Sequence, residues 1–224
     1  MEVEKKNTGF DYTDLKIKVC GMRDKNNILD LIDKVSPDYI GFIFYEKSPR
    51  HALKLDADFV KGLEGVLKVG VFVNEGKAFV LNMVKEYGLD LVQLHGDESP
   101  AFCQQLKEKG IKITKAIPVK KHLYPSQLRE YQNYVDYFLF DTKGDQRGGN
   151  GQAFDWSVLK TYDLKVPFFV AGGVSVSNLM DLKLLEGSSL HAIDVNSKFE
   201  TKPGFKETEK LKELKNKLSD LIKV

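Results

Sequence analysis

The amino-acid sequence predicts a single-domain (β/α)₈ barrel. Short apolar runs alternate with amphipathic stretches, a pattern typical of parallel strands that are each followed by a helix. This alternation occurs eight times along the chain. A length of 224 residues also lies within the range of one such barrel and allows one sizeable core.

Eight strands and eight helices are therefore expected in alternation. The predicted strands are approximately Lys16 to Cys20, Asp38 to Phe44, Leu67 to Val73, Leu89 to Leu94, Lys112 to Ile117, Tyr137 to Asp141, Phe168 to Ala171 and Ala192 to Val195. The predicted helices begin near Lys25, Asp56, Gly76, Ser99, Pro125, Asp155, Ser177 and Lys206. A doubly wound open sheet is the competing architecture, but the Gly-x-Gly-x-x-Gly turn expected of many such sheets does not occur here.

The amino-acid composition of the chain limits the kinds of molecule that we expect it to bind. The chain has 34 Lys and Arg against 32 Asp and Glu, a net charge of +2, and its basic residues are scattered rather than clustered. We therefore expect no nucleic-acid partner. No apolar run approaches the roughly 20 residues of a membrane helix, and Met1 to Asp14 lacks the apolar centre of a signal peptide. These features predict a cytoplasmic protein with no membrane partner, in which residues 1–15 form a polar extension and residues 16–224 the barrel.

The two cysteines are expected to be free thiols. Cys20 and Cys103 lie far apart, with no Cys-x-x-Cys or Cys/His cluster around either. This spacing predicts neither a disulfide framework nor a metal site. Cys103, within a predicted helix, is interpreted as a core residue.

Two residues at the carboxyl ends of predicted strands are candidates for chemistry. Asp141 ends an apolar strand, and Cys20 ends another and is followed at once by Gly21. Barrels place their catalytic groups at the carboxyl ends of their strands. A thiol and a carboxyl group are therefore expected to converge on one mouth of the barrel.

The segments after the last two predicted strands suit a phosphate group. Gly172 and Gly173 lead into a predicted helix start, and Asn196 and Ser197 follow the eighth strand. Backbone N–H groups and helix N-termini in these two loops frequently bind phosphate in barrels. The sequence thus predicts a phosphorylated small molecule as substrate.

Several segments together resemble the N-(5'-phosphoribosyl)anthranilate isomerase family of tryptophan biosynthesis, from about Lys16 to the C-terminus. They are Lys18-Val19-Cys20-Gly21-Met22, Gly41 to Arg50, Val69 to Asn74, Val92-Gln93-Leu94-His95-Gly96, Phe140-Asp141-Thr142, Gly148 to Gly151 with Phe154-Asp155-Trp156, Ala171-Gly172-Gly173 and Pro203-Gly204. The resemblance implies a barrel that performs an Amadori rearrangement without metal or organic cofactor. We expect the protein to be a monomer or a homodimer.

The resemblance also implies roles for residues. Asp141 is expected to be the general acid and Cys20 the general base, and Arg50 is expected to pair with the anthranilate carboxylate. A free thiol has a pKa of about 8.5, so we expect a cation near Cys20, with Arg50 as the candidate. His95 is interpreted either as a structural residue or as a wall of the site that orients other groups. Gln93 is expected to pack inside the barrel.

The glycine cluster Gly148, Gly149 and Gly151 suits a loop that closes over substrate. The chain departs from the family pattern Asp-Val-Ser-Ser-Gly-Val-Glu after the eighth strand, where Lys198 replaces the glycine.

Two other possibilities for the function stay open. Another phosphate-binding barrel enzyme, such as indole-glycerol-phosphate synthase or the aminoaldose isomerase of histidine biosynthesis, would need a different acid and base. A non-catalytic phosphosugar-binding barrel is the other.

Overall fold

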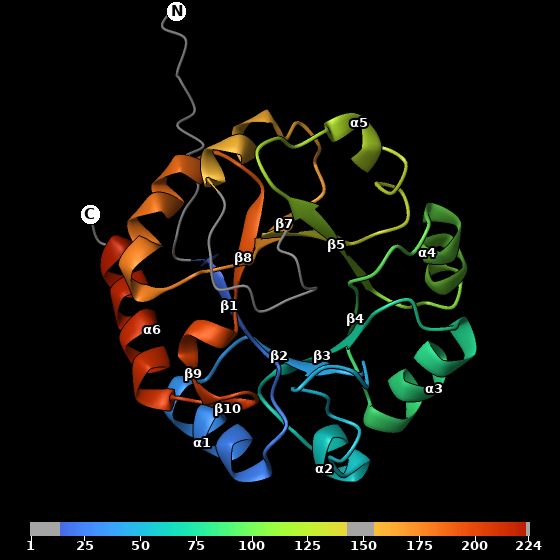
Figure 1. Ribbon diagram of the computed structural model, residues 1–224, viewed down its shortest axis with the longest axis vertical. Coiled ribbons are helices and arrows are strands. Elements are labelled where there is room, and N and C mark those ends of the chain that lie inside the picture. The colour runs from blue at the N-terminus through green and yellow to red at the C-terminus, as the bar shows by residue number, and fades with distance from the viewer. Residues whose placement is uncertain (1–13, 143–154, 223–224) are drawn as a thin grey trace, which may run out of the picture.

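The computed structural model describes residues 14–142 and 155–222, which form a closed barrel of eight parallel strands surrounded by helices (Figure 1). The strands follow one another around the barrel in chain order. They are β1 (Lys16–Cys20), β2 (Tyr39–Ile43), β3 (Leu67–Phe72), β4 (Leu91–Leu94), β5 (Ile113–Val119), β6 (Tyr137–Thr142), β7 (Phe168–Val170) and β8 (Leu190–Val195). The predicted fold class is confirmed.

A helix follows each barrel strand, close to the positions expected from the sequence. The α-helices are α1 (Lys25–Val35), α2 (Ala57–Lys61), α3 (Lys77–Tyr87), α4 (Pro100–Lys107), α5 (Pro125–Leu128) and α6 (Thr208–Ile222). Side-chain caps explain several of these starts, since Asp24, Asp56 and Ser99 each accept a hydrogen bond from a backbone N–H of the first turn.

Three features differ from the expected pattern. The helices after β6 and β7 are 3₁₀ helices, η2 (Trp156–Thr161) and η3 (Val176–Leu185). A further 3₁₀ turn, η4 (Ser197–Phe199), and a hairpin of β9 (Glu200–Lys202) and β10 (Phe205–Lys206) separate β8 from α6. The hairpin turns at Gly204, whose φ of 81° favours glycine. The glycine cluster 148–151 and most of the 1–15 extension lie outside the described residues.

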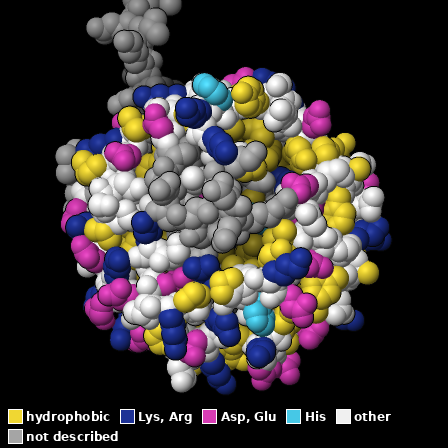
Figure 2. Space-filling view, viewed as in Figure 1, with side chains coloured by type: hydrophobic (Ala, Val, Ile, Leu, Met, Phe, Trp, Pro, Cys, Tyr) yellow, Lys and Arg dark blue, Asp and Glu magenta, His cyan; other side chains and the backbone are white. Residues whose placement is uncertain are grey.

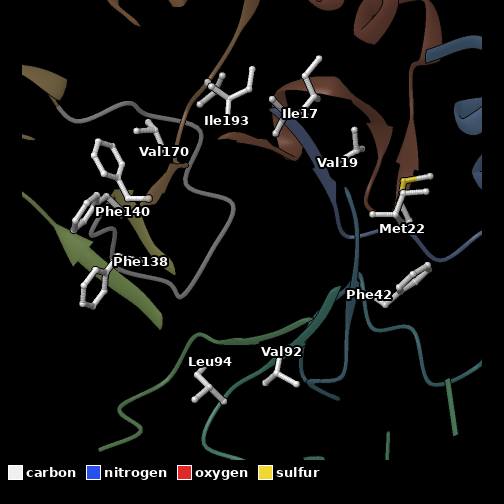
Figure 3. Packing of buried hydrophobic residues seen from close by; sticks show 14 of the residues in the cluster. Ile17, Val19, Met22, Phe42, Val92, Leu94, Phe138, Phe140, Val170 and Ile193 are labelled. Carbon is white, nitrogen blue, oxygen red and sulfur yellow. The ribbon is translucent and has the colours of Figure 1, made fainter. Parts of the chain in front are cut away.

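The strands place alternate side chains on the two faces of the barrel wall. Val19, Phe42 and Phe140 belong to the large apolar cluster that packs against the helices, as do the other residues drawn in Figure 3. A second, smaller cluster, which includes Val69, Leu139 and Phe169, comes from the alternate strand positions and fills the barrel interior. The sticks in Figure 3 therefore show the layer between strands and helices.

The two ends of the sheet close between β1 and β8. Lys18 is in register with Asp194, and Cys20 is in register with Gly41 on the other side of β1. This closure joins segments from the two ends of the chain and gathers their carboxyl ends at one mouth.

No helix in the described ranges is long and apolar enough to cross a membrane. Basic and acidic side chains are interspersed over the face shown in Figure 2.

Candidate active site

A cavity of about 450 Å³ opens at the carboxyl ends of the strands. Every site residue predicted from the sequence lines this cavity. The lining includes Cys20, Arg50, Gln93, His95, Asp141, Gly172, Gly173, Asp194, Asn196, Ser197 and Lys198, together with the apolar side chains of Ile43, Val71 and Val73.

Cys20 is held by its neighbours on two strands. Its thiol is buried, and a Cβ atom on Gly41 of β2 would lie 2.8 Å from the sulfur. Gly21, with a φ of 79°, turns the chain where a Cβ atom would lie 2.8 Å from Cδ of Arg50. Glycine is thus required both beside the thiol, at Gly41 on the neighbouring strand, and directly after it in the chain, at Gly21.

Burial raises the pKa of the Cys20 thiol above its ordinary value, because the thiolate is poorly solvated in the barrel. The positive charges of Lys18 and Lys206 act in the opposite direction and favour the thiolate. These two lysines supply positive charge near Cys20, for which the sequence offered Arg50 as the candidate. Arg50 instead makes an ion pair with Glu200.

Asp141 lies beside His95 on the other side of the barrel mouth. Nε2 of His95 is 3.3 Å from Oδ2 of Asp141, and both side chains are mostly buried. On its other nitrogen, Nδ1, His95 is 2.8 Å from Nε2 of Gln93. His95 therefore forms part of the cavity wall between Gln93 and Asp141.

A buried polar network lies beneath Cys20 in the barrel interior. Lys18 Nζ donates to Oδ2 of Asp194 at 2.7 Å and to Oε1 of Gln93 at 2.8 Å. All three side chains are almost fully buried. Gln93 does lie inside the barrel as expected, but as part of this hydrogen-bonded network.

A second network holds Arg50 at the mouth. Nε and Nη2 of Arg50 donate to both carboxylate oxygens of Glu200, at 2.7 to 3.0 Å. Lys206 Nζ donates to the same carboxylate at 2.6 Å and to Oδ1 of Asn196 at 2.7 Å. Glu200 thus joins two cations and links the hairpin after β8 to the loop after β2.

The loops after β7 and β8 both line the cavity. Gly172 and Gly173 both have a positive φ, 73° and 76°, a backbone that exposes N–H groups and that L-residues rarely adopt. Asn196 and Ser197 lie opposite at the end of β8. Lys198 is exposed in η4 and, among the described non-glycine residues, only Ser36 and Asn74 have a positive φ. Lysine at this position is therefore accommodated without a left-handed backbone.

Within the described part of the chain, no group of three or more His, Cys, Asp or Glu side chains is arranged to hold a metal ion.

Comparison with known proteins now places the chain. Residues 17–217 match the family model described as N-(5'phosphoribosyl)anthranilate (PRA) isomerase. The chain is 40% identical to the N-(5'-phosphoribosyl)anthranilate isomerase of Parabacteroides distasonis, over 88% of this chain and 90% of that protein. It is 35% identical to the enzyme of the same name from Phocaeicola vulgatus, over 92% and 98% of the two chains. The chain belongs to the N-(5'-phosphoribosyl)anthranilate isomerase family.

Solved structures of this isomerase family have the same barrel. The enzyme from Thermus thermophilus superposes with a TM-score of 0.77 at 28% identity, over 92% of this chain and all of the other. The structure of the phosphoribosyl anthranilate isomerase in complex with reduced 1-(o-carboxyphenylamino)-1-deoxyribulose 5-phosphate has a TM-score of 0.72 at 26% identity, over 92% and 99%. Related structures include engineered monomers of the dimeric Thermotoga maritima enzyme.

Sequence reasoning did not assign a role to Lys18, Glu200 or Lys206 in this isomerase site. A signal for Lys18 was present, because it stands two residues before Cys20 on a strand and therefore points to the same face. A charged residue on the inner face of a barrel strand is rarely buried without a partner. The contacts of Glu200 and Lys206 required the tertiary structure.

Proposed function

We propose that this protein converts N-(5'-phosphoribosyl)anthranilate to 1-(2-carboxyphenylamino)-1-deoxyribulose 5-phosphate, with Asp141 as general acid and Cys20 as general base. The observation that carries the proposal is that the thiol and the carboxyl group line one cavity. In the strand order, Cys20 on β1 lies between the glycine loops after β7 and β8 and Arg50 after β2. This order suits a long substrate with an anion at each end.

The reaction needs one proton donor and one proton acceptor. Asp141 protonates the ribose ring oxygen as its bond to C1' breaks, and the anilino nitrogen lone pair forms the protonated Schiff base. Cys20 thiolate then removes the proton from C2', and the C–H electron pair gives the enolamine. As the enolamine becomes the ketone, C1' takes the proton from the Cys20 thiol, and the C2' hydroxyl gives its proton to the Asp141 carboxylate. The catalytic pair thus returns to its starting state with no net proton change.

The two anionic ends of the substrate orient it over this pair. The phosphate is assigned to the backbone N–H groups around Gly172, Gly173 and Ser197, and the anthranilate carboxylate to Arg50. The apolar side chains of Ile43 and Val71 line the same cavity and suit the aromatic ring.

The test is an assay of phosphoribosylanthranilate, generated chemically, by the loss of its fluorescence. Cys20→Ala should lower kcat by roughly 10²- to 10⁴-fold, as loss of a positioned base commonly does. Cys103→Ala is the matched control, because Cys103 is buried in α4 outside the cavity and should leave kcat nearly unchanged. A Cys20→Ala enzyme with more than about a tenth of the wild-type kcat would show that the base is misassigned.

Asp141→Asn tests the acid in the same assay. The amide keeps the shape of the side chain but has no acidic proton, so kcat should fall far more than KM rises. An effect on KM alone would make Asp141 a binding residue and contradict the mechanism.

We also infer that the protein acts in the cytoplasm on a free phosphorylated metabolite, because the family's reaction belongs to amino-acid biosynthesis. We propose a monomer or a homodimer in solution, which sedimentation equilibrium of the purified chain would decide.

A further inference from the structure

The ammonium group of Lys18 has no part in the steps above, although it belongs to the buried network directly beneath Cys20. Lys18 is 1% exposed, and its side chain points into the barrel from the same face of β1 as Cys20. Burying a cation inside a barrel is unfavourable unless it is paired and hydrogen-bonded. The contacts of Lys18 therefore indicate what the group does.

The Lys18 ammonium donates to Oδ2 of Asp194 at 2.7 Å and to Oε1 of Gln93 at 2.8 Å. Its positive charge also acts on the thiol of Cys20, which stands two residues further along the same face of β1. Burial is the largest single influence on the pKa of the Lys18 ammonium and lowers it, but the influences of Asp194 and Cys20 together outweigh burial and raise this pKa above its ordinary value.

The same ammonium determines the direction of a hydrogen-bond chain to Asp141. Because an ammonium only donates, the Gln93 atom facing Lys18 must be the carbonyl oxygen Oε1. The Gln93 amide nitrogen then faces His95 and donates to Nδ1, at 2.8 Å. A neutral His95 that accepts at Nδ1 carries its proton on Nε2, the atom 3.3 Å from Oδ2 of Asp141.

We propose that Lys18 is a positioning residue for both catalytic groups of the isomerase. Its charge stabilises the thiolate of Cys20, and its hydrogen bond to Gln93 selects the His95 tautomer that donates to the Asp141 carboxylate left after proton transfer. The inference rests on the roles of Cys20 and Asp141 proposed above. The buried Lys18 ammonium thereby acts on the base Cys20 directly. It acts on the acid Asp141 through two intervening side chains, Gln93 and His95.

Other charged groups also face this network. The negative charge of Asp194 on β8 disfavours the thiolate form of Cys20, and the positive charge of Lys206 on β10 favours it. Asp141 and His95 in turn influence the pKa of Asp194. Burial is the largest influence on the pKa of Cys20 and raises it, and Lys18 is the largest of the influences that lower it. Removing Lys18 should therefore raise the pKa of Cys20 further.

The first part of the proposal, the effect of Lys18 on the base Cys20, is called the base half. It is tested by the pH dependence of Cys20 alkylation with iodoacetamide, in a Cys103→Ala background so that one thiol reacts. Lys18→Met keeps the length of the side chain but removes the charge. The midpoint of the alkylation profile should move to higher pH by about one unit, which is about a tenfold loss of thiolate at a fixed pH below it. A general disturbance of packing that exposed Cys20 would move the midpoint the opposite way.

Lys18→Met leaves Asp194 buried without its partner, so a second variant protects the test against unfolding. Lys18→Met/Asp194→Asn removes both charges and leaves two neutral side chains. Its alkylation midpoint should still lie above that of the Cys103→Ala parent, because Lys18 influences Cys20 more strongly than Asp194 does. A midpoint equal to or below that of the parent in this folded variant would overturn the base half.

The second part of the proposal, the effect on the acid Asp141 through Gln93 and His95, is called the acid half. It is tested by ¹⁵N NMR of the histidines, with the His95 signals assigned by their loss in His95→Gln. The wild-type protein should show the tautomer protonated at Nε2. Gln93→Leu should abolish this preference and lower kcat, while leaving the Cys20 alkylation midpoint close to that of the parent. An unchanged His95 tautomer in Gln93→Leu would overturn the acid half.

These measurements separate this inference from the catalytic assignment. Alkylation and NMR report on Cys20 and His95 whether or not the two residues act in turnover. An active Cys20→Ala enzyme would overturn the proposed base, whereas an unshifted alkylation profile would overturn only the proposed effect of Lys18 on Cys20.

Discussion

Nη2 of Arg50 lies 2.7 Å from Oε2 of Glu200, and Nε of the same guanidinium donates to both oxygens of that carboxylate. Burial alone would raise the pKa of Glu200, but Arg50 and Lys206 outweigh it and hold the pKa below its ordinary value. Glu200 therefore stays ionised and fixes the orientation of the Arg50 guanidinium before substrate binds. Pre-positioning of this kind reduces the side-chain entropy lost on binding.

Arg50→Ala should weaken substrate binding with little change in kcat. Loss of a charged hydrogen-bond partner commonly costs about 1.5 to 3 kcal/mol, so KM should rise by roughly 10- to 100-fold. The deficit should shrink for an analogue that lacks the anthranilate carboxylate. Equal losses for substrate and analogue would exclude the pairing of Arg50 with the carboxylate.

Glu200→Gln tests whether the ion pair itself orients Arg50. The amide retains one acceptor but removes the charge between Arg50 and Lys206, so the guanidinium should lose its fixed orientation and KM should rise less than in Arg50→Ala. Steady-state kinetics would measure this, and a KM equal to that of the wild type would show that Arg50 needs no support from Glu200.

Gly41→Ala should displace the catalytic thiol. The added methyl group would lie 2.8 Å from Sγ of Cys20, too close for normal contact, and overpacking of this kind typically costs about 1 to 3 kcal/mol. Gly70→Ala on β3 is the control, because its methyl group would meet Leu89 and Phe72 instead of the site. Both variants should lower the urea midpoint, but only Gly41→Ala should lower kcat beyond the loss of folded protein. Equal losses of kcat in the two folded variants would contradict this reasoning.

His191 should make stability depend on pH at the amino end of the barrel. Its Nε2 lies 2.8 Å from the hydroxyl of Tyr39, and burial lowers the pKa of the imidazole. Since the unfolded histidine titrates near 6.5, the unfolded chain binds the proton first. The stability contribution is thus complete above about pH 6.5 and is lost as the pH falls from there through the lowered folded pKa.

Urea unfolding at pH values between about 7.5 and 5 measures this dependence. His191→Phe should remove part of the decline at low pH, whereas His122→Gln, at an exposed position, should retain it. If both variants lose stability with falling pH as steeply as the wild type, His191 is not the group responsible.

Lys198→Gly should change KM by less than roughly tenfold and leave kcat nearly intact. Lys198 is exposed in η4, and an exposed ion contact with phosphate is worth about 0 to 1 kcal/mol and weakens with salt. Gly173→Val should instead raise KM steeply, because Gly173 has a φ of 76° and valine both strains this backbone and obstructs the anion. Loss of activity in Lys198→Gly together with tolerance of Gly173→Val would place the phosphate on the lysine.

The sequence by itself determined the barrel, with its eight strands and helices in alternation, and the polar residues at the strand ends that line its mouth. These follow from local signals, namely the alternation of apolar runs with amphipathic stretches and the polar residues at strand ends. The predicted strand β1 matches the observed bounds, and Cys20 and Asp141 line one cavity as expected. The 3₁₀ character of η2 and η3 was missed, because apolar spacing distinguishes these tighter turns from α-helix poorly.

The tertiary structure alone decided which charges meet. Lys18 and Asp194 are 176 residues apart, and Arg50 and Glu200 are 150 apart, so neither pair leaves a local pattern. Closure of β8 against β1 brings Asp194 into register with Lys18, and the hairpin after β8 brings Glu200 to Arg50. The cations that aid Cys20 were therefore hidden in the sequence, because a pKa depends on the charges and solvent that the folded chain places around a group.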